Sequence, residues 1–228
     1  MTNPARAVLF DLDGTLVDPA GAITEGILAA LLRHGVPHPG DERLEALVGP
    51  PLAIGLLGLP GMDEELLPSV IADYRAEYAA SGMAASRVYP GIADLLAELR
   101  DSGLALAVAT SKPQDIAVRL LEMQGLLGLF DAVHGSPNDE HHTVHSGPGK
   151  AHIVGAALAA VGAEARDAVM VGDRHYDVDG AGAHGMACIG VAWGYAAEGE
   201  LETAGAHAVV DSADGLRELL LGAAGRAV

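Results

Sequence analysis

Six short runs of apolar residues recur along the chain, and segments with helical periodicity lie between the later ones. The apolar runs are residues 7–10, 104–109, 132–134, 168–171, 187–191 and 208–210. The helical segments are residues 92–100, 114–123, 151–161 and 177–184. Because the runs are apolar throughout rather than alternating, both faces of the sheet must be covered. The sequence therefore predicts an α/β fold with a doubly wound parallel sheet, in which ligands bind at the carboxyl ends of the strands.

One section interrupts this alternation, between the first and second strands. Residues 19–86 contain amphipathic helix patterns and no convincing strand. The segments ITEGILAALLRHG and DERLEALVG each end on a glycine that stops a helix, and DEELLPSVIADYRAEYAA is a third helical stretch. We expect residues 1–17 and 87–228 to form a Rossmann-like α/β core and residues 18–86 to form a helical cap above the first strand's carboxyl end.

The charge and composition limit the partners of the chain. Its 228 residues are 50% hydrophobic, enough for a substantial core, and its formal net charge is -18. Such a charge repels nucleic acid and anionic membranes but allows a small anionic substrate if a bound cation reverses the local sign. No apolar segment has the length of a signal peptide or a membrane span, so we expect a cytoplasmic protein. Cys188 is the only cysteine, so we expect no internal disulfide. We also expect a monomer or a weak homodimer.

Two predicted strands run directly into carboxylates. In VLFDLDGTLVD the first strand is followed by Asp11 and Asp13, and like charges this close cost stability unless a cation lies between them. In AVMVGDRHYDVDGA another strand is followed by Asp173, with Asp177 and Asp179 beyond it. Acidic residues also cap helices, which accounts for Asp177 or Asp179 but not for Asp173 at the strand end. The sequence therefore predicts a cation site at this edge of the sheet.

The only two lysines of the chain fall at the same predicted edge. Lys112 follows the strand in LALAVATS, just after Thr110, and Lys150 opens the helix after SGPG. Oxygen ligands alone favour magnesium over zinc. A carboxylate left free to act is a competent nucleophile towards phosphorus when a metal and a lysine neutralise the transferred group.

Four motifs occur in the order found in the haloacid dehalogenase superfamily of phosphohydrolases, which the sequence resembles over nearly its whole length. They are FDLDGTLVD, VATSK, Lys150 and VGDRHYDV, and the helical insertion lies where that family places its cap. LVGPPL, VYPG and GVAWGYAAEGEL further resemble the phosphoglycolate phosphatase-like branch, which includes some 5'-nucleotidases. The resemblance implies a magnesium-dependent phosphatase that hydrolyses a phosphoglycolate-like metabolite or a nucleoside monophosphate through an aspartyl phosphate.

The resemblance also implies roles for individual residues. Asp11 would attack phosphorus, and Asp13 would protonate the leaving oxygen and then deprotonate the hydrolytic water. The catalytic residues it implies are Asp11, Asp13, Thr110 and Lys150. The phosphate-binding residues are Asp11, Leu12, Asp13, Thr110, Ser111 and Lys150. The magnesium ligands are Asp11, the Asp13 backbone carbonyl and Asp173, supported by Asp177, and the substrate-selecting residues are Gly49, Pro50 and Pro51.

Two other functions stay open. A phosphosugar mutase shares the aspartyl-phosphate step, and a non-enzymatic phospho-acceptor domain also uses an aspartate at the edge of a parallel sheet. Asp13 and the helical insertion favour the phosphatase over the phospho-acceptor domain. Further candidates for substrate recognition are the cap arginines Arg33, Arg43 and Arg75.

A histidine-rich stretch precedes Lys150. Its three imidazoles could hold a transition metal, but the surrounding Pro, Gly, Asn and Asp are typical of a solvated loop. The residues concerned are His141, His142 and His145.

Overall fold

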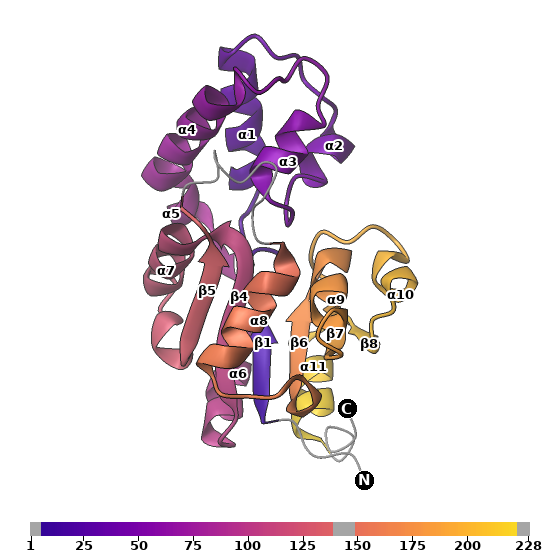
Figure 1. Cartoon of the computed structure of the whole chain (residues 1–228). Helices are drawn as coiled ribbons and strands as arrows, with labels where there is room; N and C mark the ends of the chain where they lie inside the picture. Colours follow the sequence, from indigo (N-terminus) through magenta and orange to yellow (C-terminus); the bar gives the residue numbers. More distant parts are fainter. Residues whose placement is uncertain (1–5, 139–148, 223–228) are drawn as a thin grey trace.

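The computed structural model describes residues 6–138 and 149–222, and its centre is a six-stranded parallel sheet (Figure 1). The strand order is β5 (Ala132–Ser136), β4 (Ala105–Pro113), β1 (Ala7–Phe10), β6 (Ala168–Gly172), β7 (Ala187–Val191) and β8 (Ala208–Val210). The chain builds from β1 outwards through β4 and β5, then returns to the other side of β1 with β6. This reversal next to β1 is the topological switch point at which such sheets bind ligands. The predicted α/β fold class is confirmed.

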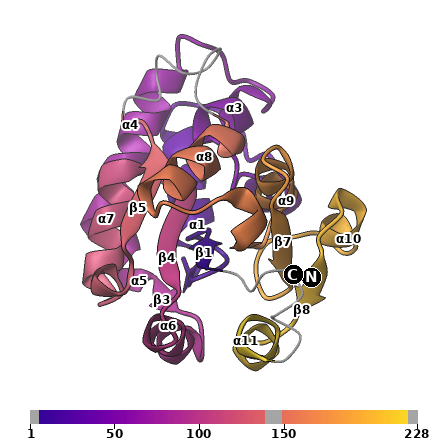
Figure 2. The ribbon, with the colours of Figure 1, turned by 60° about the horizontal axis from the view of Figure 1, so that its bottom comes forward.

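Helices cover both faces of the sheet, as strands without polar alternation require (Figure 2). One face is covered by α6 (Ile92–Asp101), α7 (Gln114–Met123) and α11 (Ala213–Leu221). The other is covered by α8 (Lys150–Ala160), α9 (His175–Gly182) and α10 (Glu200–Ala204). Alternate residues of β1 enter the two cores: Val8 and Phe10 pack in the first, Ala7 and Leu9 in the second. Short 3-10 turns, Leu127–Leu129 and Ala165–Asp167, precede β5 and β6.

The segment after β1 forms a helical insertion, which lies above the carboxyl ends of the strands (Figure 1). A two-stranded antiparallel ribbon of β2 (Val17–Asp18) and β3 (Arg87–Val88) connects it to the sheet. Its helices are α1 (Ala22–Arg33), α2 (Asp41–Glu45), α3 (Leu52–Leu57), α4 (Leu67–Glu77), the π-helix Tyr78–Gly82 and α5 (Met83–Ala85). Residues 22–85 thus contain no strand, as the sequence predicts.

Several element boundaries differ by one to four residues from the sequence-based expectation, among them the end of β4 and the start of α9. Strand β4 continues to Pro113 instead of ending at residue 109, and its pairing with β5 is irregular between Ala109 and Pro113. Helix α9 begins at His175, two residues earlier than expected, because the Asp177 carboxylate accepts a hydrogen bond from the Arg174 backbone and so caps the first turn. Within the described residues, no helix has the length and hydropathy that a bilayer span requires.

Candidate active site

Asp11 is the first residue after β1, and its side chain is bound to Lys150. The Asp11 backbone N–H donates to the Val171 carbonyl of β6, which fixes the residue between the two central strands. Lys150, the first residue of α8, places Nζ 2.7 Å from Asp11 Oδ1 and 2.6 Å from Asp177 Oδ1. Burial opposes the charge on Lys150, but the two carboxylates raise its pKa. The lysine therefore stays cationic at the strand ends.

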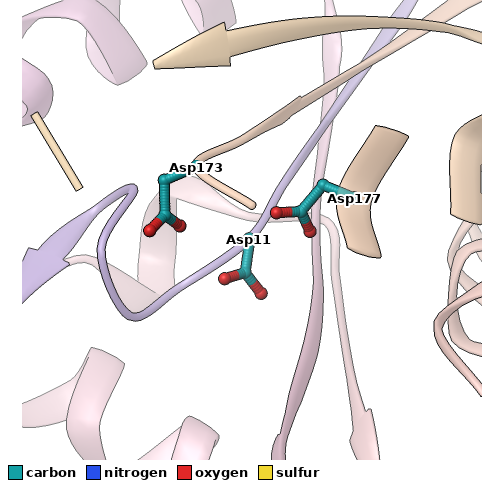
Figure 3. Close-up of side chains that lie close together, drawn as sticks. All are labelled: Asp11, Asp173 and Asp177. Carbon is teal, nitrogen blue, oxygen red and sulfur yellow. The ribbon is translucent and has the colours of Figure 1, made fainter. Parts of the chain in front are cut away.

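Three carboxylates converge at this point. Asp11, Asp173 and Asp177 each offer an oxygen, and these oxygens lie within 4.8 Å of one another (Figure 3). All three side chains are buried. Burial and the neighbouring Asp11 and Asp177 raise the pKa of Asp173, and burial, only partly offset by Lys150, raises the pKa of Asp177 to about 6. The oxygens of these three buried carboxylates form a donor set that stays negatively charged even beside one lysine. Such a set fits a divalent cation such as Mg²⁺.

Asp173 is held rigidly by its neighbours. Thr15 Oγ1 donates to Oδ1 at 3.0 Å, and the Tyr195 backbone N–H donates to Oδ2 at 2.8 Å. A Cβ on Gly14 would lie 2.2 Å from Asp173 Oδ2, and one on Gly194 would lie 2.4 Å from Asp173 Cβ. Gly14 also has a positive φ of 85°. The carboxylate can occupy this position only because two side chains are absent around it.

Asp13 has a different cationic partner from Asp11. Lys112 Nζ lies 2.7 Å from Asp13 Oδ2, and both side chains are buried. The ammonium also lies 4.5 Å from the ring centroid of Tyr78, which belongs to the helical insertion. Asp13 Oδ1 is buried without a hydrogen-bond partner among the described residues. Burial, partly countered by Lys112, raises the pKa of Asp13, which favours a proton on this carboxyl group.

A small cavity of about 60 Å³ lies between the sheet and the helical insertion. The core contributes Asp11, Asp13, Thr110, Ser111 and Lys112 to its lining, and the insertion contributes Ile23, Leu47, Val48, Gly49, Pro50, Leu52 and Tyr74. Its floor is therefore charged and polar, whereas its roof is mostly apolar. A phosphate group fits the chemistry of the floor, and the roof would contact the rest of a substrate.

The structure brings most of the predicted site residues together, but not all. Leu12 is buried, outside the cavity lining, and its carbonyl accepts backbone N–H groups of Leu16 and Val17. Pro51 directly precedes α3 and is also outside the lining, unlike its neighbours Gly49 and Pro50.

The three arginines of the helical insertion lie elsewhere. Arg33 pairs with Glu77, Arg75 donates to the Asn138 carbonyl, and Arg43 is exposed; none of the three lines the cavity. The histidines His141, His142 and His145 lie outside the described residues.

Sequence reasoning did not identify several residues that shape the site. The scarcity of lysine indicated Lys112, but nothing in the sequence indicated that Asp13, 99 positions away, is its partner. Thr15 stands beside the first carboxylates in the sequence, so its bond to Asp173 could have been suspected. The Tyr195 contact is made by a backbone N–H and leaves no residue-type signal.

Comparison with known proteins identifies a family. Residues 8–191 match the model described as haloacid dehalogenase-like hydrolase. The tyrosine-protein kinase PtkA of Mycobacterium tuberculosis is 39% identical over 94% of this chain and 72% of its own length. A 5'-nucleotidase of Pseudomonas aeruginosa is 38% identical over 85% of this chain and 86% of its own. A phosphoglycolate phosphatase of Caulobacter vibrioides is 31% identical over 90% and 86%.

A solved structure agrees in fold over nearly the whole chain. The crystal structure of a predicted phosphatase from Clostridium acetobutylicum superimposes with a TM-score of 0.87 at 37% sequence identity. The match covers 96% of this chain and 99% of that one, so it includes the helical insertion as well as the sheet.

Proposed function

The chain belongs to the haloacid dehalogenase-like hydrolase family, and from this premise we propose that it is a magnesium-dependent phosphatase of small phosphorylated metabolites. The observation that carries the proposal is the division of two nearby aspartates between two lysines. Asp11 lies against Lys150 in the carboxylate cluster, whereas Asp13 lies against Lys112 beside the cavity. In this proposal Asp11 acts as the nucleophile and Asp13 transfers protons.

The reaction proceeds in two steps on these residues. A carboxylate oxygen of Asp11 attacks phosphorus, the bond to the ester oxygen breaks, and Asp13 gives its proton to that oxygen. Asp13 then takes a proton from water, which attacks the aspartyl phosphate, releases inorganic phosphate and restores Asp11. Lys150 and Thr110 hold the phosphoryl oxygens. Asp11, Asp173 and Asp177 would hold Mg²⁺, together with the Asp13 carbonyl, and the ion neutralises charge on the transferred group when bound.

The helical insertion supports the proposal that the substrate is small. In this proposal residues 18–86 act as a cap over a core of residues 1–17 and 87–228, and they exclude water during phosphoryl transfer. The apolar roof of the cavity would contact the leaving group. The names of the relatives supply the first substrates to try, which are nucleoside 5'-monophosphates and phosphoglycolate.

The test is hydrolysis of a panel of phosphate monoesters: phosphoglycolate, nucleoside monophosphates, sugar phosphates and p-nitrophenyl phosphate. We expect phosphate release that disappears with excess chelator, returns with magnesium and is inhibited by calcium, whose looser coordination misplaces the attacking carboxylate. Asp11→Asn serves as the inactive control. Full activity in excess chelator would overturn the role of the metal.

The same panel separates the other candidate functions. Isomerisation of a sugar phosphate without phosphate release would indicate a mutase. A stable phosphoaspartate with no turnover would indicate a phospho-acceptor domain. Because one relative is named a tyrosine kinase, the protein is also incubated with magnesium and ATP. Phosphotyrosine on the protein without hydrolysis of any ester would contradict the phosphatase proposal.

A further inference from the structure

Arg174 links the metal-binding edge of the sheet to the helical insertion. It follows Asp173 directly, and the residue is only 7% exposed. Its guanidinium Nη1 donates a hydrogen bond to the backbone carbonyl of Val48. Val48 lines the cavity together with the next two residues, Gly49 and Pro50. We call residues 48–52 the substrate loop.

The arginine is itself fixed from the other side. Its Nε donates to Glu200 Oε1 at 2.9 Å. Glu200 also accepts from the backbone N–H of His175 at 2.9 Å and from that of Ala197 at 3.0 Å, and His175 Nδ1 lies 2.8 Å away. Burial opposes the charge on Glu200, but these hydrogen bonds lower its pKa to about 2. A carboxylate that is ionised at neutral pH thus holds the guanidinium in one orientation.

The substrate loop lies directly on the arginine side chain. Gly49 has a φ of 109°, and a Cβ there would lie 3.1 Å from Arg174 Cγ and 3.6 Å from its Nη1. The loop backbone therefore approaches closely enough for its carbonyl to be bound. Val48 is 2% exposed, so loss of the guanidinium removes a charged donor from a carbonyl in a buried setting.

We propose that Arg174, held by Glu200, is a positioning residue that fixes the substrate loop over the cavity and thereby sets the affinity for the phosphate ester. The inference rests on the proposed function, because the loop matters only if the cavity receives a substrate. Arg174 does not touch the reacting atoms in this proposal. Its hydrogen bond joins the core to the insertion and must break if the insertion swings away. Arg174 therefore favours the closed arrangement.

This role predicts a separation of KM from kcat. If the closed arrangement is less populated without the guanidinium, apparent affinity falls in proportion, while the chemistry of the closed state is unchanged. We expect Arg174→Gln to raise KM about tenfold, as the loss of one charge-assisted hydrogen bond implies, with kcat changed less than about threefold. The Arg174 backbone N–H still caps α9 through Asp177 in this variant. Arg174→Lys and Glu200→Gln should also raise KM, but by smaller factors than Arg174→Gln.

A matched control and a second readout complete the experiment. Arg166→Gln makes the same change at an exposed arginine before the amino end of β6 and should leave KM unchanged. Amide hydrogen exchange of residues 46–58 should speed up in Arg174→Gln and not in Arg166→Gln. Magnesium affinity, measured by calorimetry, should be the same in both variants.

Three results would overturn the proposal: unchanged KM and exchange in Arg174→Gln, an equal effect in Arg166→Gln, or a loss of magnesium affinity that explains the whole effect. If Arg174→Gln does not fold, Arg174→Lys and Glu200→Gln carry the same test. If the wild-type protein hydrolyses no ester, the proposed function fails. Faster exchange in residues 46–58 of Arg174→Gln alone would then still support the positioning of the loop.

Discussion

Asp11 and Asp13 are separated by one residue, yet their electrostatic surroundings differ. Asp11 shares Lys150 with Asp177 and lies within the carboxylate cluster. Asp13 is outside that cluster, bound to Lys112, and burial raises its pKa. The ion pair with Lys150 holds Asp11, the proposed nucleophile, within the carboxylate cluster. The raised pKa of Asp13, caused by burial, suits an acid that must first donate a proton.

This difference predicts opposite behaviour of two substitutions. Asp11→Asn should abolish turnover, because an amide is a poor nucleophile. Asp13→Asn removes only proton transfer, which typically increases the reaction rate by about 10²–10⁴-fold. With p-nitrophenyl phosphate the leaving group needs no proton, so the aspartyl phosphate forms but is hydrolysed slowly. Intact-protein mass spectrometry should therefore detect phosphoenzyme in Asp13→Asn and none in Asp11→Asn.

The two variants control for each other, since both replace a buried carboxylate by an amide at the same strand end. Equal labelling of both, or phosphate mapped to any residue other than Asp11, would contradict the division of roles.

At the residue level, the sequence revealed groups whose position follows from a strand end. Asp11, Asp13 and Asp173 each follow a buried strand. Because the carboxyl ends of parallel strands lie at the same edge of the sheet, the proximity of these three aspartates could be predicted. The partners of these groups could not be predicted to the same extent. The Asp13–Lys112 pair depends on side-chain reach across two strands, and the Arg174–Val48 bond depends on how the insertion sits over the sheet.

At the level of elements, local patterns predicted which segments form strands and helices but not how they end. The start of α9 is set by the Asp177 cap and not by apolar periodicity, which begins later. The end of β4 is set by its renewed pairing with β5, Pro113 with Ser136, after an irregular stretch. That stretch contains Thr110, Ser111 and Lys112, which line the cavity. Such endings depend on tertiary partners, which a sequence window does not contain.

Helix α10 supports the turn between β6 and α9 through its first residue, and this support should depend on pH. Hydrogen bonds lower the pKa of Glu200 from 4.5 to about 2, although burial opposes them. A lowered pKa stabilises the folded protein above the unfolded value and loses its effect as pH falls through the folded value. We expect Glu200→Gln to reduce the free energy of unfolding by roughly 1–2 kcal/mol at pH 7, with the deficit shrinking between about pH 4.5 and pH 2.

Urea unfolding at several pH values measures this deficit. Glu202→Gln, an exposed position in the same helix, is the control and should differ little from the wild type at any pH. A deficit that stays constant from pH 7 to pH 3 would show that Glu200 acts through packing and not through its charge.

On the scale of the whole molecule, the fold brings acidic side chains together where the carboxyl ends of the strands meet the helical insertion. The chain carries a formal charge of -18, and its described cluster of acidic side chains able to hold a cation lies at the switch point beside β1. The overall charge excluded nucleic acid as an expected partner from the sequence alone, but it could not indicate where an anionic substrate would bind. The cytoplasmic location and the monomeric or weakly dimeric state remain predictions.

The carboxylate cluster should cost the metal-free protein stability. Burial and the neighbouring carboxylates raise the pKa of Asp173, so the folded state disfavours its charge. The free energy of unfolding therefore falls as pH rises above the ordinary Asp value of 3.8, and the cost is present at neutral pH. Asp173→Asn removes the charge, while an amide can still accept from Tyr195 N–H and donate to the Thr15 hydroxyl. We expect this variant to have a higher Tm than the wild type in chelator at pH 7.5, by about 2–4 °C for each kcal/mol relieved.

Magnesium should reverse the order of the two Tm values, so that the wild type has the higher Tm. A ligand at about a hundred times its Kd stabilises a protein by about 2.7 kcal/mol, which for a chain of this size is about 5–10 °C in Tm. The wild type should gain this increase on addition of magnesium, whereas Asp173→Asn should gain none and should hydrolyse no ester. Asp179→Asn, an exposed acid on α9, should follow the wild type in both conditions. A lower Tm for Asp173→Asn in chelator would show that its hydrogen bonds outweigh the repulsion among the carboxylates. An unchanged wild-type Tm at saturating magnesium would mean that these three residues do not form a magnesium site.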